Sequence, residues 1–541
     1  MRAPIVRIAA VAVMVGLIGA GCSKTSDVSE SAPTTTAAPR AHVGGLLAYG
    51  VETDPNGLDA TRNAWDPVGL LVANTMIDTW SEFDSNLVAQ PYLAESFEHT
   101  PDFMSWTIHI RPGVSFSDGE PLNADAGVKM INGIRNSAIT GLAPVDIQDV
   151  VKVDELSFKM IMNKPWASFP AVMTGQGGYV ESPKQLDDPS GFLHPIGTGP
   201  FVLKNWDSEK VISVTRNEHY WRKDANGVRL PYLDGVDFHI LPDGPARVAA
   251  LQSGTIDVTT ATNALDVRAL AALSDTGFNV AHDEGPTDTT FVMFNTTKAP
   301  LNDVRVRQAI AYATDVNALA GPNGWPKDRL ADSPFAKGSK WYADTGFPKY
   351  DLAKAKALVA AYEAEHGKIT ISLNGAFETG VLQQLVDQWA QAGITATVTI
   401  SEFKKYVIVA VAGQYDAELF HYFGTGDPDN LWHFWSSATA RPVGSLSLNF
   451  TRLSDPQIDK GVDAARATDD LASRQASYKD VQQRFTDLVP YVWLYHTDWV
   501  IATRLGVHDV RNVTLPDGSA AAPYDSGAHR LGETWIDPTQ H

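Results

Sequence analysis

The feature that most constrains this chain is its single cysteine, Cys22, which ends an apolar stretch near the N-terminus. One cysteine cannot form an intramolecular disulfide or a cysteine-based zinc cluster. The chain after it must therefore be stabilised by burial of its own apolar side chains. Its 541 residues are 44% apolar, which excludes a largely disordered protein and predicts roughly three to four domains.

The N-terminal segment has the pattern of a secretion signal. Arg2 and Arg7 supply positive charge ahead of the apolar run Ile8–Ile18. That run is too short to cross a bilayer comfortably, which takes about 20 residues. The small residues Gly19–Gly21 before Cys22 resemble a bacterial lipobox, although Gly19 stands where leucine is usual.

We therefore expect residues 1–21 to be a lipoprotein signal peptide and Cys22 to carry the lipid. Residues 22–41, rich in Ser, Thr, Ala and Pro, would form a flexible tether. This places the folded part at the outer face of the cytoplasmic membrane, held there by the lipid anchor. The alternative is ordinary signal cleavage with a free or buried Cys22.

Charge and motifs exclude several functions. The chain has 43 Lys and Arg against 63 Asp and Glu, a net charge of −20, which argues against a nucleic-acid partner. It contains no P-loop, no G-x-S-x-G nucleophile elbow and no H-E-x-x-H. His421 and His433 are too far apart for one helical turn, so we interpret each as structural. We expect no enzyme activity, no catalytic residues and no metal site.

Helix and strand patterns alternate along the chain, which predicts a mixed α/β protein of more than one domain. Trp106–Ile110 and Thr395–Ile400 alternate apolar and polar residues, as half-buried strands do. Val304–Ala313 and Leu471–Leu488 follow the helical period, the first with Asp303 as a candidate N-cap.

Several motifs follow one another in order over nearly the whole chain. They are Pro91–Phe97, Trp106–Gly119, Gly197–Phe201, Ala250–Asp257, Pro300–Ala309 and Lys354–Leu358. Together they resemble the family 5 extracellular solute-binding proteins of ABC importers, the peptide and nickel group. Glu52–Leu58, Gly426–Asn430 and Ala465–Asp470 are most similar to the dipeptide-binding lipoproteins of that family.

The resemblance implies an α/β, two-lobed periplasmic-binding-protein-like fold of class II, cluster C, with three domains and a hinge. The hinge would lie near Gly285–Pro286 and Tyr495–His496. The implied limits are 42–85, 191–285 and 498–541 for domain I, 86–190 for domain II and 286–497 for domain III.

The same resemblance implies a function. The chain would be the lipid-anchored, monomeric component that captures short peptides, di- to oligopeptides, and delivers them to the permease and ATPase subunits of an ABC importer. It would need no cofactor. Alternative cargoes are haem, an oligosaccharide or a nickel chelate. An alternative of another class is an envelope interaction lipoprotein with a vestigial cleft.

Peptide-binding members lay the ligand out as an added strand, so backbone edges are part of the implied site. By position these edges are Val51–Asp54 and Tyr422–Thr425. The candidate ligand-binding residues are Val51, Glu52, Thr53, Asp54, Phe377, Glu378, Tyr422, Gly424, Thr425, Asp427 and Arg441.

The charged clamps of the family differ here. Gly424 stands where an aspartate is expected to hold the ligand ammonium, and no arginine occurs within Asn374–Glu378 to hold its carboxylate. Asp427 and Glu378 are candidates for the ammonium, and Arg441 for an anion. The alternatives are a turn or cap role for Asp427 and a solvated loop for Arg441.

Other residues of the motifs are interpreted as structural. Arg305 and Arg307 would form surface or inter-element ion pairs. Trp221 would belong to the core, and Trp432 and Trp435 to the core rather than to the pocket.

Overall fold

The computed structural model describes residues 41–137, 146–282, 288–376, 379–422, 426–523 and 528–540. Residues 41–541 form one compact unit. The predicted signal peptide and most of the tether, with Cys22, lie outside the described residues. So do Phe377, Glu378, Gly424, Thr425 and the proposed hinge dipeptide Gly285–Pro286.

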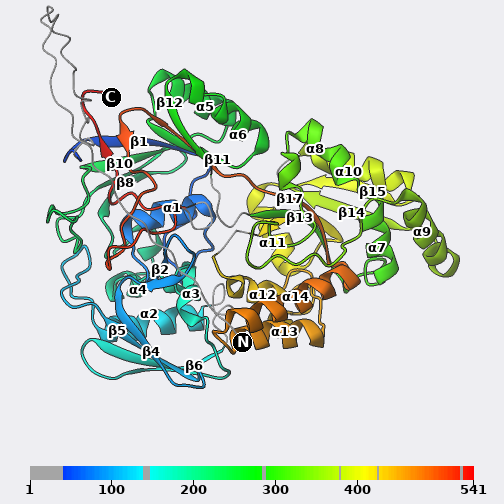
Figure 1. Cartoon of the computed structure of the whole chain (residues 1–541), viewed down its shortest axis with the longest axis horizontal. Coiled ribbons are helices and arrows are strands. Elements are labelled where there is room, and N and C mark those ends of the chain that lie inside the picture. The colour runs from blue at the N-terminus through cyan, green and yellow to red at the C-terminus, as the bar shows by residue number, and fades with distance from the viewer. Residues whose placement is uncertain are drawn as a thin grey trace, which may run out of the picture. The chain divides into compact units, whose positions relative to one another are not determined.

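The first large sheet is mixed and draws strands from both ends of the chain (Figure 1). In spatial order its strands are β12 (Phe278–His282), β18 (Val500–Arg504), β11 (Val258–Ala261), β1 (Leu46–Val51), β10 (Gly235–Ile240), β9 (Val211–Arg216) and β8 (Phe201–Asp207). β1 runs parallel to β10 and β11, while β18 is antiparallel to β11 and β12. Three helices accompany it: α1 (Pro67–Met76), α5 (Gly244–Ser253) and α6 (Ala264–Ala271).

A smaller antiparallel sheet has its own core of buried aromatic and aliphatic side chains, including Trp80, Trp106 and Trp166. Its strands are β4 (Ala94–His99), β5 (Ser105–Ile110), β7 (Ser157–Met162) and β6 (Ile147–Lys152). The neighbouring elements are β2 (Ser81–Phe83), β3 (Ala89–Pro91), α2 (Ala124–Asn136), α3 (Phe169–Val172) and α4 (Pro183–Asp187). The chain ends in the pair β19 (Val507–His508) and β20 (Trp535–Ile536).

The second large sheet lies within residues 289–496 and carries the most extensive hydrophobic core. Its strands are β15 (Thr395–Ile400), β14 (Thr370–Gly375), β16 (Ala417–Tyr422), β13 (Thr289–Phe294) and β17 (Tyr491–His496). Its helices are α7 (Val304–Ala313), α8 (Val316–Asn323), α9 (Leu352–His366), α10 (Thr379–Gln391), α11 (Phe403–Ala412), α12 (Trp432–Trp435), α13 (Pro456–Arg466) and α14 (Leu471–Leu488).

Short 3-10 turns occur in several parts of the chain. They are η1 (Gln176–Gly178), η2 (Gly191–Leu193), η3 (Ser274–Thr276), η4 (Lys327–Arg329), η5 (Pro428–Leu431) and η6 (Ser437–Thr439).

Most expectations about local structure are confirmed. The predicted strands correspond to β5 and β15, and the predicted helices to α7 and α14. Asp303 caps α7, since its side chain accepts a hydrogen bond from the Arg305 backbone N–H. Trp432 and Trp435 are buried in the core. In the part of the chain that is described, no helix is both long and apolar enough to cross a bilayer.

The two arginines of α7 behave differently from each other. Arg305 forms the predicted ion pairs, with Asp303 and Glu365. For Arg307 the prediction is a surface or inter-element ion pair; the residue is not at the surface, being 4% exposed, and its inter-element contacts are hydrogen bonds to the carbonyls of Leu301 and Leu488. Leu488 ends α14, where backbone carbonyls have no partner within the helix. The buried guanidinium of Arg307 thus donates to a carbonyl at the end of α14 that has no N–H partner within the helix.

The two large sheets and the four-stranded sheet fall within the ranges predicted for the domains, whereas the pair β2–β3 crosses the predicted limit between residues 85 and 86. The limits stay a prediction. The chain leaves the first large sheet between β12 and β13, and returns to it between β17 and β18. Separate sheets with separate cores make this a multi-domain α/β fold of the two-lobed kind.

The second large sheet contains a buried acid, Glu418 in β16. Its side chain is 0% exposed, and neither carboxylate oxygen has a hydrogen-bond partner. Burial alone raises the pKa of Glu418 to about 9. The folded protein therefore keeps Glu418 protonated at neutral pH, whereas the unfolded chain loses this proton near its ordinary pKa.

This predicts a specific pH dependence of stability. Between about pH 5 and pH 9 the folded state binds a proton that the unfolded state has lost, so rising pH removes about 1.4 kcal/mol of unfolding free energy per pH unit. Glu418→Gln should abolish this contribution, so that its stability relative to wild type increases from pH 6 to pH 8. Urea unfolding at each pH measures the difference. Glu120→Gln, at an exposed glutamate, is the control and should leave the slope unchanged; parallel pH curves for wild type and Glu418→Gln would contradict the prediction.

Candidate functional site

The strand directions bring corresponding edges of the two large sheets together. β12 and β11 both end beside Val500, the first residue of β18, so the chain crosses at the carboxyl edge of β11 and of its parallel neighbour β1. In the second sheet β13 begins beside Tyr422 and His496, which end β16 and β17. Both crossings therefore join the carboxyl edges of the parallel strands, where α/β sheets bind ligands.

The two crossings are bonded to each other. The backbone N–H of Thr497 donates to the carbonyl of Asp288 at 2.7 Å. The Asp498 carboxylate contacts His282 at 3.0 Å and Arg329 at 3.6 Å. These contacts adjoin the predicted hinge at Tyr495–His496.

On the first sheet, Val51 ends β1 and Glu52 follows it. The Glu52 carboxylate lies 3.3 Å from Arg247, and its side chain keeps 40% of its surface exposed. Even so, loss of solvation raises the pKa of Glu52, more than Arg247 lowers it. Glu52 is thus a partly accessible carboxylate beside Arg247 at the carboxyl end of β1.

Thr53 and Asp54 instead stabilise their surroundings. The Thr53 hydroxyl donates to Asp66 at 2.7 Å, and Asp66 caps α1. Asp54 accepts hydrogen bonds from Trp206, Ser208 and the backbone of Glu209. Both side chains fix the loop after β1, so a ligand contact at these positions would come from the backbone.

On the second sheet, Tyr422 points its hydroxyl into the core, where it contacts the hydroxyl of Tyr491. Its neighbour His421 is partly accessible, and burial lowers its pKa to about 4. His433 in α12 is partly accessible as well, with its pKa also lowered to about 4, chiefly by burial. Both imidazoles are therefore neutral at pH 7. Among the described residues, no group of three or more His, Cys, Asp and Glu is arranged to hold a metal ion.

Asp427 has a structural partner that the sequence analysis missed. Arg474 of α14 binds both of its carboxylate oxygens, at 2.6 and 2.7 Å. Asp427 also caps η5, accepting from the backbone N–H of Asp429. Its side chain is 10% exposed. Asp427 therefore has the geometry of a helix cap, and Arg474 matches its charge without a ligand.

Arg441 also makes local contacts. Its guanidinium donates to the carbonyls of Ala438 and Ala440, both at 2.8 Å. These bonds brace its own loop. The structure therefore brings Val51, Glu52 and Tyr422 to the facing sheet edges, and places the side chains of Asp427 and Arg441 in internal contacts.

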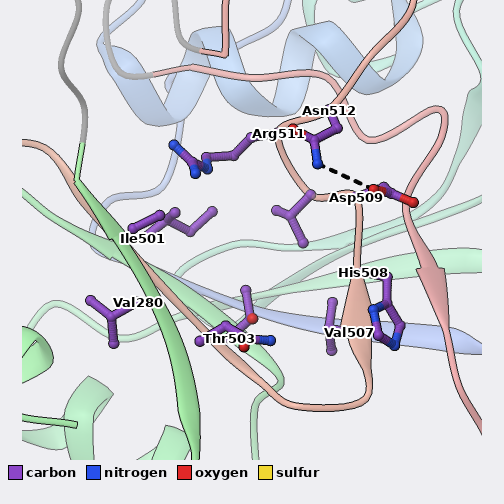
Figure 2. A pocket seen from close by; sticks show the side chains of 11 residues that line it. Val280, Ile501, Thr503, Val507, His508, Asp509, Arg511 and Asn512 are labelled. Atoms are coloured by element: carbon purple, nitrogen blue, oxygen red, sulfur yellow. Dashed lines mark hydrogen bonds between the residues drawn. The ribbon is translucent and has the colours of Figure 1, made fainter. Parts of the chain in front are cut away.

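A cavity of about 260 Å³ lies elsewhere on the first sheet, between β12, β18 and the segment after β19 (Figure 2). Val280, Ile501 and Val507 form part of its wall. The Asn512 side chain donates to Asp509 at 3.2 Å across its rim. This cavity is lined by the sides of strands rather than by their carboxyl ends, so it is separate from the candidate site.

The Asp427–Arg474 pair gives a test of Asp427. Asp427→Asn leaves Arg474 buried without its counter-charge, and we expect a loss of about 3 kcal/mol of unfolding free energy, measured by chemical denaturation. Asp480→Asn, at an exposed position of the same helix as Arg474, should change stability by less than about 0.5 kcal/mol. Unchanged stability combined with weakened ligand binding would instead make Asp427 a ligand contact.

Comparison with known proteins gives relatives of similar length. The dipeptide-binding protein of Escherichia coli K12 is 26% identical over 481 residues, covering 79% of this chain and 86% of that protein. Heme-binding protein A of Haemophilus influenzae is 27% identical over 454 residues, covering 75% of this chain and 79% of its own length.

Solved structures share the fold. The periplasmic binding protein DppA of Helicobacter pylori, in complex with the peptide STSA, superposes with a TM-score of 0.78 at 21% identity, covering 92% of this chain and 98% of that one. A binding protein of Agrobacterium tumefaciens R10 with agropinic acid also gives 0.78, at 23% identity and with 91% and 99% covered. The pattern of the bacterial extracellular solute-binding proteins, family 5 (middle region), matches residues 88–442, and the chain belongs to this family.

Proposed function

We propose that this protein is the lipid-anchored substrate-binding component of an ABC importer and that it captures short peptides. The observation that carries the proposal is that both chain crossings lie at the carboxyl edges of the parallel strands of the two large sheets, the edges at which α/β sheets bind ligands. Relatives named for dipeptides and for di- and tripeptides support the peptide class. Delivery to permease and ATPase subunits, and action as a monomer, are parts of the same proposal.

Glu52 is our candidate for the peptide's ammonium group, beside Glu378. Asp427 has its charge matched by Arg474, whereas Glu52 is partly accessible and only partly compensated by Arg247. A ligand ammonium would supply a second positive charge in a desolvated place. Charged hydrogen bonds of this kind contribute about 1.5–3 kcal/mol.

Glu52→Gln should therefore weaken peptide binding by about tenfold or more, and the protein should stay folded because Arg247 keeps Asp266 as a partner. Isothermal titration with the peptide recovered from the purified protein measures this. Glu218→Gln, at an exposed glutamate, is the matched control and should bind as wild type does. If Glu52→Gln binds equally well, another group holds the ammonium.

The identity of the cargo is tested by mass spectrometry of whatever is released on denaturing the purified protein. Short peptides of a narrow length range support the proposal. An oligosaccharide or a nickel chelate would keep the importer role and replace the cargo. Recovery of no small molecule, with no binding of a peptide library, would favour the envelope protein with a vestigial cleft.

Haem is a second candidate cargo, favoured by the neutral, partly accessible imidazoles of His421 and His433 and by the haem-binding relative. A neutral imidazole can donate its lone pair to iron. Titration with haemin would then shift the Soret band, and His421→Gln or His433→Gln would remove the shift. A spectrum equal to that of free haemin excludes this cargo.

Anchoring rests on Cys22. In the full-length chain, Cys22→Ser should move the protein from the membrane fraction to the soluble fraction, because lipid addition requires the thiol. Fractionation followed by immunoblotting tests this. Ser23→Ala, the neighbouring change, should leave the protein in the membrane fraction; a membrane-bound Cys22→Ser protein would contradict lipidation.

A further inference from the structure

The strongest unexplained feature is a buried charge cluster that joins the smaller sheet to the second large sheet. Arg466, the last residue of α13, is 2% exposed. Its guanidinium binds Asp429 of η5 at 2.8 Å and Asp146, just before β6, also at 2.8 Å. Asp429 and Arg466 belong to predicted domain III, whereas Asp146 belongs to predicted domain II.

The contact has two preformed halves. On the domain III side, Arg466 pairs with Asp429 and lies 4.1 Å from the ring of Trp432. On the domain II side, the ring of Trp166 lies 4.3 Å from the same guanidinium. Trp166 is fixed in the domain II core, where its carbonyl accepts from the indole of Trp106.

Polar bonds across the same boundary are short and buried. Asp429 accepts hydrogen bonds from the Trp166 indole at 2.6 Å and from the Ser168 hydroxyl at 2.8 Å. The backbone N–H of Ala167 donates to the carbonyl of Arg466 at 2.7 Å. Lys164 and Asp463 add a more exposed ion pair at 2.8 Å.

The path of the chain shows that this contact lies away from the covalent links between the sheets. The chain enters and leaves the smaller sheet without passing through the second large sheet, and the crossings to the latter lie at 283–288 and 497–499. The cluster is therefore a non-covalent contact away from these crossings. Moving the lobes apart would strip Asp146 of its arginine and Asp429 of two of its donors.

We propose that Asp146, Trp166, Ser168, Asp429 and Arg466 form a closure lock that holds domain II against domain III without any cargo. Buried charges separated from their partners are costly, so the lock favours the closed arrangement in the empty protein. The charge of Asp427, a candidate ligand contact, is matched by Arg474, and that of Asp429 by Arg466. Asp429 thus contributes to closure, whereas Asp427 is paired within its own lobe.

The lock rests on the proposed function in one respect only, since it has a role only in a protein whose lobes open and close. Its test needs no cargo. A failure of the lock would appear as an altered lobe distance in the empty protein, whereas a failure of peptide capture would appear in the released-ligand experiment.

The experiment is a distance measurement by double electron–electron resonance on residues 41–541, which form a compact unit. This span has no native cysteine, because Cys22 lies outside it. Spin labels at Val153→Cys and Ile400→Cys use exposed positions, one in each lobe. The protein is unfolded, freed of small molecules and refolded before measurement, and its circular dichroism confirms refolding.

Without cargo, the labelled parent should populate mainly the shorter distance. Asp146→Asn removes one charge from the lock and should lower the closed-to-open ratio by about tenfold or more. Ser168→Ala, a milder change that removes one hydroxyl donor, should lower the ratio in the same direction. Asp149→Asn makes the same charge change at an exposed position of β6 and should leave the ratio as it is.

Three results would overturn the lock: a parent protein that is open without cargo, an unchanged distance distribution in both lock variants, or an equal shift in Asp149→Asn. If Asp146→Asn fails to refold, Ser168→Ala decides alone, because its unchanged ratio would equally refute the proposal.

Discussion

The rest of the structure depends on how the chain crosses between its two large sheets. The link 497–499 is short, and Thr497 is hydrogen bonded to Asp288 of the other crossing. A link this short leaves little freedom in the separation of the two sheets at this point. Both crossings lie at the carboxyl edges of the parallel strands, where α/β sheets bind ligands.

Several acidic side chains of this protein form internal ion pairs and so have their charge matched without a ligand. The pairs Arg474–Asp427 and Arg466–Asp429 place the most conspicuous acidic motif of the chain in internal contacts. Unlike these paired acids, Glu418 is buried without a counter-charge, and its raised pKa keeps it neutral at pH 7. Near the sheet edges, Glu52 and His421 remain partly accessible.

Local structure could be predicted from the sequence wherever one period dominated, as in Val304–Ala313 and Thr395–Ile400. The family and its fold were predictable from ordered motifs. The partners of charged residues were not, because Arg466 meets Asp146 across 320 positions and Arg307 meets a helix end 181 positions away. A lone charge within an apolar run, such as Glu418 in Ala417–Tyr422, was an available signal of unusual burial.

The order of strands in the first large sheet also bears on how the protein is made. β18 lies between β12 and β11, so the sheet that begins with β1 lacks an interior strand until residues 500–504 are present. The second large sheet is drawn from 289–496 alone and can form as soon as that segment has emerged. A chain delivered from its N-terminus would therefore complete its middle first and its beginning last. Until then the edges of β11 and β12 that pair with β18 are unpaired. Unpaired strand edges can pair with other chains, so the incomplete protein is most prone to aggregation during this interval.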